Sequence, residues 1–463
     1  MSSADGPVQA ASPAAGDAID PRPARRLGIV ALVALMYLVV SGGAYGLEDA
    51  VQIGGARLTL ALCLIVPLTL SLPTALMAAE LTALMPLEGG FYYWVREALG
   101  PFAGFVEAYM TLLYTATDMA IYPVLIAAYL GFVFPLGTAA QIAVGIALVW
   151  LSGALNILGV RPVGNTSIVL MIAILAPFAA MVMVGFPRLV HWHLPAQTIP
   201  GGDLLGAIGG ALTVVIWNFS GWENLSVVAA EIENPRRNYA RAIAFALPLV
   251  TIGYLLPLAV SLSGASSTAA WRLGYFVEIG RNLGGPMLAM ALVAGGAISA
   301  FSIFDAAMLW VSRMPYVLAR EGYLPRRLAR IWADRATPAT SIVVCCVVFS
   351  LLVPLGFVAL VVLDVFFYMG ALMLEMWALI SLRRSRPDRT GLFVIGGGRP
   401  ALIAVVVAPI AIWVATFGLA VSHDAGAADL VISIVLALGA WPAYVLLRRR
   451  YGGPSSVPVD PTP

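Results

Sequence analysis

Long apolar runs recur between residues 27 and 447, and about a dozen of them approach the length of a membrane-spanning helix. A helix needs about 20 consecutive apolar residues to cross the hydrocarbon core of a bilayer. The chain is 61% hydrophobic and only 11% charged, whereas a soluble domain has about 25% charged residues. The sequence therefore predicts an all-α membrane protein with many spans.

Arginine supplies all 26 basic residues, and its distribution predicts the topology. With the N-terminus placed in the cytoplasm, twenty-two arginines fall in inner segments and four in outer segments. Cytoplasmic loops of membrane proteins are enriched in basic residues. This split predicts twelve spans with both termini in the cytoplasm. The predicted helices cover residues 27–53, 58–84, 101–131, 139–160, 163–186, 204–232, 240–263, 284–319, 339–353, 356–381, 400–421 and 428–447.

Two apolar runs are interrupted at comparable places. SGGAYG, residues 41–46, follows fourteen almost wholly apolar residues, which rise only about 21 Å and cannot span a bilayer alone. SGWEN, residues 220–224, follows the apolar run LLGAIGGALTVVIWNF. Unwound backbone cannot face lipid and must line a cavity. Discontinuous helices at matching positions of two halves are typical of the substrate site of secondary transporters, although two ordinary glycine kinks would give the same pattern.

The breaks divide the chain into expected parts. We expect a disordered cytoplasmic segment over 1–26, which is rich in Ala, Pro, Ser, Gly and Asp. A first inverted repeat is expected over 27–186 and a second over 204–381. Two further helices over 400–447 and a cytoplasmic tail over 448–463 complete the chain. The segment PLEGGFYYWVRE, residues 86–97, is too short and mixed to span, and it either lines an inner vestibule or rests at the membrane interface.

Both breaks carry motifs of a known family. WNFSGWENLSVVAAEIENPRRNYARAI resembles the sixth-helix signature of the amino acid–polyamine–organocation superfamily, F-x-G-x-E followed by N-P-x-R. GGAYGLED, LPTALMAAELTALMPLEGGFYYWVREALGPFAGF and TDMAIYPVLIAAYL resemble its branch of polyamine/proton symporters and L-type amino acid transporters. The resemblance implies a LeuT-like 5+5 inverted repeat with helices one and six broken. It also implies a substrate site between those helices, with contributions from helices three, eight and ten.

Nine carboxylates fall within or near the ends of the predicted spans, whereas no arginine falls near a span centre. They are Glu48, Asp49, Glu107, Asp118, Glu223, Glu231, Asp305, Asp364 and Glu375. Charges inside a membrane are costly and face the bundle interior. Without basic partners, they must be neutralised by protons, metal ions or a cationic substrate. For Asp364 and Glu375 we favour a role as buried structural acids over a functional one.

Besides Glu48 and Asp49, three acids are candidates for substrate contact. Glu223 matches the glutamate of F-x-G-x-E, and Asp118 lies mid-helix, one turn before Tyr122. Both are also candidates for proton coupling. Asp305 is the third acid, and the Tyr122 side chain is a further candidate for substrate contact.

The breaks also offer backbone and aromatic groups. Freed carbonyls can accept hydrogen bonds from an ammonium group, and Trp217 either caps a cation by cation–π attraction or only packs. The N–H groups of Gly43 and Gly46 could hold a carboxylate, which an amino acid needs and a polyamine does not. Glu48 and Asp49 either contact substrate or cap the outer half-helix. The candidate residues in the breaks are Ser41, Gly42, Gly43, Ala44, Tyr45, Gly46, Glu48, Asp49, Trp217, Phe219, Ser220, Gly221, Trp222 and Glu223.

We therefore expect a secondary active transporter of the bacterial inner membrane that imports a cationic organic amine, in our preferred interpretation a polyamine, by proton symport. The alternatives are an amino acid permease or exchanger, and a transceptor that binds without transport. A sodium site in this fold would use two adjacent hydroxyl side chains of helix eight. Ser299 and Ser302 are three residues apart, so that adjacent pair is missing. The expected partners are an amine or amino acid, protons and the lipid bilayer. No catalytic site, metal site, cofactor or nucleic-acid surface is predicted.

Overall fold

The computed structural model describes residues 27–85, 90–158, 165–196, 199, 202–226, 232–263, 265–331, 337–386, 392–421 and 427–452. The predicted disordered segment 1–26, most of the predicted tail 448–463, and Glu231 lie outside these residues. The described chain is helical, apart from one isolated bridge between Leu27 and Ile232. Its elements are α1 (Ile29–Val40), α2 (Leu47–Val66), η1 (Pro67–Ser71), α3 (Leu72–Leu84), α4 (Gly90–Leu99), α5 (Pro101–Gly131), α6 (Thr138–Ile157), α7 (Asn165–Val190), α8 (Leu204–Asn218), α9 (Pro235–Leu262), α10 (Tyr275–Val311), α11 (Arg313–Arg320), η4 (Arg326–Ala329), α12 (Ala339–Leu352), η5 (Val353–Leu355), α13 (Phe357–Ser385), α14 (Gly398–Val421), α15 (Ala427–Leu438) and α16 (Ala440–Tyr451).

The first predicted helix break is confirmed. α1 ends at Val40 and α2 begins at Leu47. Gly43 and Gly46 have φ angles of 89° and 91°, a left-handed conformation that is easily adopted only by glycine. A Cβ atom on Gly46 would lie 2.9 Å from the Trp217 ring. The absence of a side chain at Gly46 therefore also lets the first break approach the end of α8.

The second predicted break begins where expected. α8 ends at Asn218, and residues 219–226 form turns and one short 3-10 segment. Gly221 has a φ of 93°, which again favours glycine. Residues 227–231, where the helix was expected to resume, lie outside the described residues.

The helices support a multi-pass membrane protein. In the described ranges, nine helical segments are long and apolar enough to cross a membrane, and three shorter apolar helices, α1, α8 and the α12–η5 segment, accompany them. Outer helices expose large apolar side chains, such as Leu351 and Leu438, which a bilayer would cover. The count of twelve spans and the 5+5 repeat stay predictions.

Two predicted helix starts were wrong. α10 begins at Tyr275, not at residue 284, and the glycines at 284 and 285 form a kink inside it. α9 begins at Pro235, not at residue 240, because proline is favourable in the first turn of a helix. Both errors place a helix start too late in the chain.

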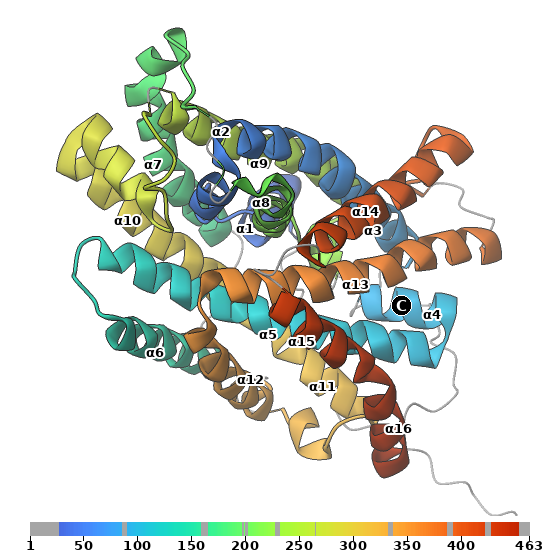
Figure 1. Ribbon diagram of the computed structural model, residues 1–463. Coiled ribbons are helices and arrows are strands. Elements are labelled where there is room, and N and C mark those ends of the chain that lie inside the picture. Colours follow the sequence, from blue (N-terminus) through green and yellow to red (C-terminus); the bar gives the residue numbers. More distant parts are fainter. Residues whose placement is uncertain are drawn as a thin grey trace, which may run out of the picture.

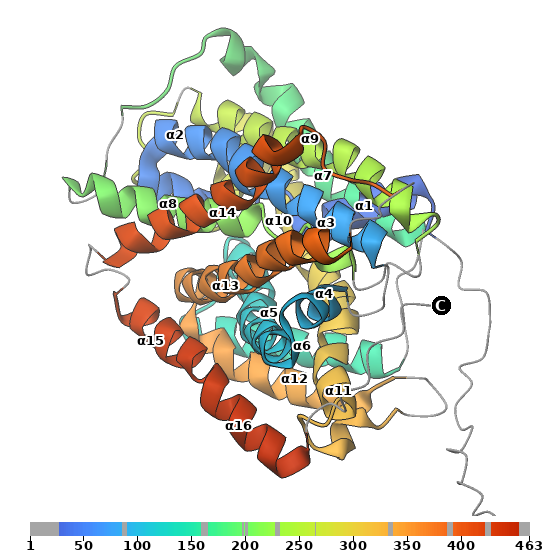
Figure 2. The same ribbon diagram turned by 90° about the vertical axis from the view of Figure 1, so that its right-hand side faces the viewer.

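Two long helices run side by side through the middle of the molecule. These are α5 and α13, and α4 lies against both of them (Figures 1 and 2). In Figure 1, α8 is seen end-on beside α1 and α2. Residues 90–99 form the predicted non-spanning helix, α4, and two ion pairs hold its end: Arg96 with Glu321 at 2.8 Å and Glu97 with Arg386 at 2.9 Å.

Candidate functional site

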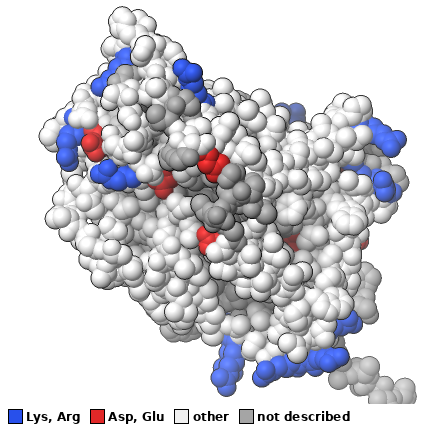
Figure 3. Space-filling view, in the orientation of Figure 1, with Lys and Arg blue, Asp and Glu red and all other residues white. Residues whose placement is uncertain are grey.

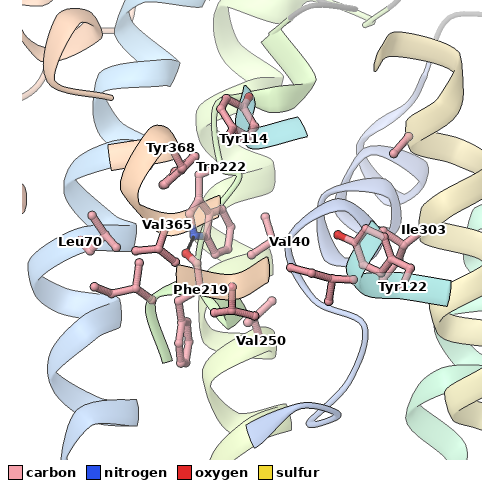
Figure 4. Packing of buried hydrophobic residues seen from close by; sticks show 14 of the residues in the cluster. Val40, Leu70, Tyr114, Tyr122, Phe219, Trp222, Val250, Ile303, Val365 and Tyr368 are labelled. Carbon is pink, nitrogen blue, oxygen red and sulfur yellow. Dashed lines mark hydrogen bonds between the residues drawn. The ribbon is translucent and has the colours of Figure 1, made fainter. Parts of the chain in front are cut away.

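A cavity lies between the two helix breaks and the middle parts of α5, α10 and α13. Its volume is about 60 Å³. Figure 4 shows Val40, Tyr122 and Ile303, which all line it. The structure brings seven predicted site residues to its wall. They are Gly42, Tyr45, Asp118, Tyr122, Trp217, Ser220 and Gly221.

Asp118, in the middle of α5, is held by two hydrogen-bond donors. The Tyr122 hydroxyl donates to its two carboxylate oxygens at 3.0 and 3.1 Å, and the indole Nε1 of Trp217 donates to Oδ1 at 3.0 Å. Residues four apart share one helix face, which is why Tyr122 reaches Asp118. The two donors orient the carboxylate but bring no positive charge to it.

Asp364 faces the same cavity from α13. Its side chain is buried, and its Oδ1 has no hydrogen-bond partner among the described residues. Asp118 and Asp364 are close enough for their charges to repel each other. The ion pairs within the described ranges bring no arginine to either of them. The cavity thus holds two carboxylates without a cationic side chain, an arrangement that attracts a cation.

Glu48 binds groups of the protein itself. One carboxylate oxygen accepts the N–H of Gly46 at 2.7 Å, and the other accepts the Tyr129 hydroxyl and the N–H of Gly274 at 3.2 Å. Its side chain is fully buried and does not line the cavity. Glu48 therefore has the geometry of a cap on the outer half-helix, and it also joins α2 to α5 and to the segment before α10.

The N–H groups expected to hold a substrate carboxylate are engaged within the chain. Gly46 donates to Glu48, and Gly43 donates to Ser41 Oγ at 3.2 Å. The Ala44 carbonyl accepts a backbone hydrogen bond inside the same turn. The first break therefore offers a carboxylate no ready donor at these two glycines.

Two other predicted carbonyl acceptors are also engaged. Gly42 accepts a hydrogen bond from Ser299 Oγ at 2.6 Å. Phe219 accepts hydrogen bonds from Ser71 Oγ and from the indole of Trp222, both at 2.9 Å, and Figure 4 shows the second of these. These contacts hold the two breaks in place.

Glu223 lies just behind the cavity wall. Its Oε2 accepts the Tyr368 hydroxyl at 3.1 Å, and that hydroxyl in turn accepts the N–H of Gly221 at 3.1 Å. Tyr368 and Tyr114 line the cavity and meet edge to face, with ring centroids 5.6 Å apart (Figure 4). Glu223 is therefore linked to the cavity through Tyr368.

Two other predicted acids lie away from the cavity wall. Asp49 is buried and accepts a backbone hydrogen bond from Leu273. Asp305 accepts hydrogen bonds from Ser152 at 2.7 Å and from Asn156 at 2.9 Å, where α6 packs against α10. The remaining predicted residues outside the cavity lining are Ser41, Gly43, Ala44, Gly46, Glu48, Phe219, Trp222 and Glu223.

Sequence reasoning omitted the two cavity tyrosines, Tyr114 and Tyr368, and favoured a structural role for Asp364 over a place in the site. The spacing between each tyrosine and an aspartate on the same helix could have indicated both tyrosines. Tyr114 precedes Asp118 by four residues, and Tyr368 follows Asp364 by four, so each tyrosine shares a helix face with an acid.

Acidic side chains gather near the centre of one face of the molecule. On the face in Figure 3, acidic side chains lie around the central region and arginines lie mostly towards the edges, and at the upper left an acidic side chain lies among arginines.

Comparisons with known proteins find a family of amino acid permeases and relatives that are named as transporters. The family model described as amino acid permease matches residues 27–440. The polyamine transporter PUT1 of Oryza sativa subsp. japonica is 32% identical over 86% of this chain and 75% of its own length. The polyamine transporter RMV1 of Arabidopsis thaliana is 30% identical over 87% of this chain and 82% of its own length.

Two further likenesses are more distant. The Asc-type amino acid transporter 1 of Mus musculus is 28% identical over 58% of this chain and 53% of its own length. The crystal structure of MhsT in complex with L-phenylalanine is similar with a TM-score of 0.61 at 13% identity, and covers 85% of this chain and 99% of that one. The MhsT likeness supports a LeuT-type helical fold.

Proposed function

This chain belongs to the amino acid permease family of the amino acid–polyamine–organocation superfamily, and we propose that it is a secondary active transporter of a cationic organic amine, namely a polyamine. The observation that carries this proposal is the pair Asp118 and Asp364, which face one cavity with no cationic side chain in its lining. A polyamine has several ammonium groups and no carboxylate, so it would neutralise both acids.

The first helix break supports an amine without a carboxylate. An amino acid would need free N–H groups there, but Gly46 donates to Glu48 and Gly43 to Ser41. To bind an amino acid in this way, the chain would have to break these hydrogen bonds first.

An amino acid permease or exchanger is the second candidate. The 28% identity to an Asc-type amino acid transporter favours it. The relatives that match more of this chain at higher identity are named as polyamine transporters, which supports the first candidate.

We further propose that protons drive import by alternating access, with Asp118 and Glu223 as proton carriers. Both are acids without an arginine partner among the described ion pairs. Asp118 lines the cavity, and Glu223 is one hydrogen bond behind it. In this proposal the protein lies in a bacterial inner membrane with both termini in the cytoplasm, and residues 27–186 and 204–381 are the two repeats.

Uptake into proteoliposomes tests the proposal. We expect uptake of labelled spermidine or putrescine that rises with an inward proton gradient and is blocked by unlabelled diamine, but not by leucine. Uptake of leucine without any amine uptake would select the amino acid permease. Saturable amine binding without counterflow would select the transceptor.

The coupling role has a separate test. We expect Glu223→Gln to bind the amine but to lose the pH dependence of uptake. If Glu223→Gln keeps the pH profile of the wild type, Glu223 is not a coupling acid.

A further inference from the structure

α5 and α13 carry the same three residue types at the same spacing, in opposite chain directions. In each helix a tyrosine lies four residues from an aspartate, and a glutamate lies seven residues beyond the tyrosine. The two sets are Asp118, Tyr114 and Glu107, descending along α5, and Asp364, Tyr368 and Glu375, ascending along α13. Because the two helices lie side by side (Figures 1 and 2), residues of the same type can lie opposite each other across their interface.

Each level of this double series is a pair across the helix interface. Asp364 is within electrostatic range of Asp118. The Tyr114 and Tyr368 rings meet edge to face at 5.6 Å. The third level, Glu107 with Glu375, is likewise within electrostatic range. We name these levels the Asp rung, the Tyr rung and the Glu rung.

The Glu rung is buried and only partly satisfied by hydrogen bonds: the Thr111 hydroxyl donates to Oε1 of Glu107 at 3.4 Å. Oε2 of Glu107 and Oε2 of Glu375 have no hydrogen-bond partner among the described residues, although the side chains are only 0% and 3% exposed. Glu223 is close enough to repel both. Within the described ranges, these acids form no ion pair, and no group of His, Cys, Asp or Glu is arranged to hold a metal ion.

The three rungs form one continuous series with the cavity. The Asp and Tyr rungs line it, and the Tyr368 hydroxyl also donates to Glu223 beside the Glu rung. The Glu rung lies seven residues, about two helical turns, beyond the cavity tyrosines. It is nearer to the start of α5 and the end of α13, the side to which the arginine distribution assigns the cytoplasm.

The rung spacing fits one class of substrate. Glu107 and Asp118 are eleven residues apart, which is about 16 Å along a helix at 1.5 Å per residue. An extended aliphatic chain advances about 1.25 Å per bond, given bond lengths near 1.5 Å, so about 13 bonds join the two outer rungs. A tetraamine such as spermine has this length between its terminal nitrogens, whereas a four-carbon diamine covers about 6 Å.

We propose that the Glu rung is a second ammonium subsite, which receives the far end of a long linear polyamine whose near end lies at the Asp rung. The Tyr rung, once parted, borders the internal ammonium groups, which aromatic faces attract. This inference rests on the proposed amine function of the cavity and adds a chain-length preference to it.

Amine binding by the full-length protein, measured by calorimetry, tests the subsite. We expect Glu375→Gln to weaken spermine binding about tenfold or more, because a charge-assisted contact is lost, and to change putrescine affinity less than about twofold. Asp364→Asn should weaken both amines. Glu278→Gln, at an exposed acid in the first turn of α10, is the control for loss of a carboxylate and should change neither affinity.

Three outcomes separate the possibilities. If Glu375→Gln changes the affinities for spermine and putrescine equally, or changes neither, the Glu rung serves proton binding or packing and the subsite proposal is overturned. If neither Glu375→Gln nor Glu107→Gln folds, wild-type affinity for α,ω-diamines of rising length decides: we expect a step near 13 bonds, and a steady trend without a step contradicts the subsite. If the wild type binds no amine at all, the proposed function itself fails.

Discussion

The indole of Trp217, at the end of α8, donates a hydrogen bond to Asp118 of α5 at 3.0 Å. This contact joins the second helix break to the middle of the third predicted span. The ring of Trp217 also packs edge to face against Phe357, with centroids 5.5 Å apart. Trp217 therefore has a positioning role towards the carboxylate, whether or not its ring also contacts a cation.

Trp217→Phe separates these two roles, because phenylalanine keeps an aromatic ring but has no N–H. We expect amine affinity to fall about tenfold, since a hydrogen bond to a charged group is worth about 1.5 kcal/mol or more. Trp413→Phe is the matched control, because the Trp413 Nε1 is buried without a partner in the described part of the chain. Unchanged amine affinity in Trp217→Phe would mean that Asp118 needs no positioning.

Asp118→Asn and Asp364→Asn should each weaken amine binding about 30-fold or more, because removing one partner of a buried charge contact costs about 2–5 kcal/mol. Isothermal titration with spermidine measures this loss. Both variants should keep the thermal stability of the wild type, because neither residue has an ion-pair partner among the described ones. In Asp118→Asn, the amide oxygen can also still accept the hydrogen bonds that Oδ1 of Asp118 receives from Tyr122 and Trp217. A variant with normal amine affinity would remove that residue from the site.

Glu48→Ala should lower the melting temperature strongly, because it strands the N–H groups of Gly46 and Gly274 and the Tyr129 hydroxyl. Each buried donor left without a partner costs about 1–3 kcal/mol. The melting temperature in detergent is compared with that of Glu278→Ala, a control that removes a carboxylate whose side chain is 44% exposed. If Glu48→Ala stays stable but loses amine binding, Glu48 contacts the substrate.

Arg383→Ala should destabilise the protein far more than Arg386→Ala. Arg383 donates from Nε to Glu80 at 2.6 Å, and Glu80 is 2% exposed and also accepts the N–H of Ile395. Losing one partner of a buried ion pair costs about 3–5 kcal/mol, whereas an exposed pair such as Arg386 with Glu97 is worth about 0.2–1 kcal/mol. The same melting experiment compares them, and equal shifts would contradict the different roles of the two pairs.

Local sequence was enough to predict the breaks. Gly43 and Gly46 adopt φ angles that favour glycine, and an apolar run of fourteen residues before Ser41 is too short to span. Asp118 was also predictable, because a mid-helix acid inside a membrane has to face the interior. These inferences need only the chain's own composition and spacing.

Other features depend on tertiary contacts that no local pattern contains. Glu48 meets Tyr129 and Gly274, which are 81 and 226 residues away along the chain, so its cap could not be separated from substrate contact by sequence. Asp364 joins the cavity only because α13 packs beside α5. Asp305 shared the pattern of Asp118, but its helix turns it towards Ser152 and Asn156.

The most direct test of the central claim, that Asp118 and Asp364 bind a cationic amine, is equilibrium competition on the purified protein. Labelled spermidine is bound to the wild type and to Asp364→Asn, and displaced by unlabelled spermidine, leucine or arginine. We predict displacement by spermidine alone and a large loss of binding in Asp364→Asn. Displacement by leucine, or spermidine affinity that is unchanged in Asp364→Asn, would contradict the account.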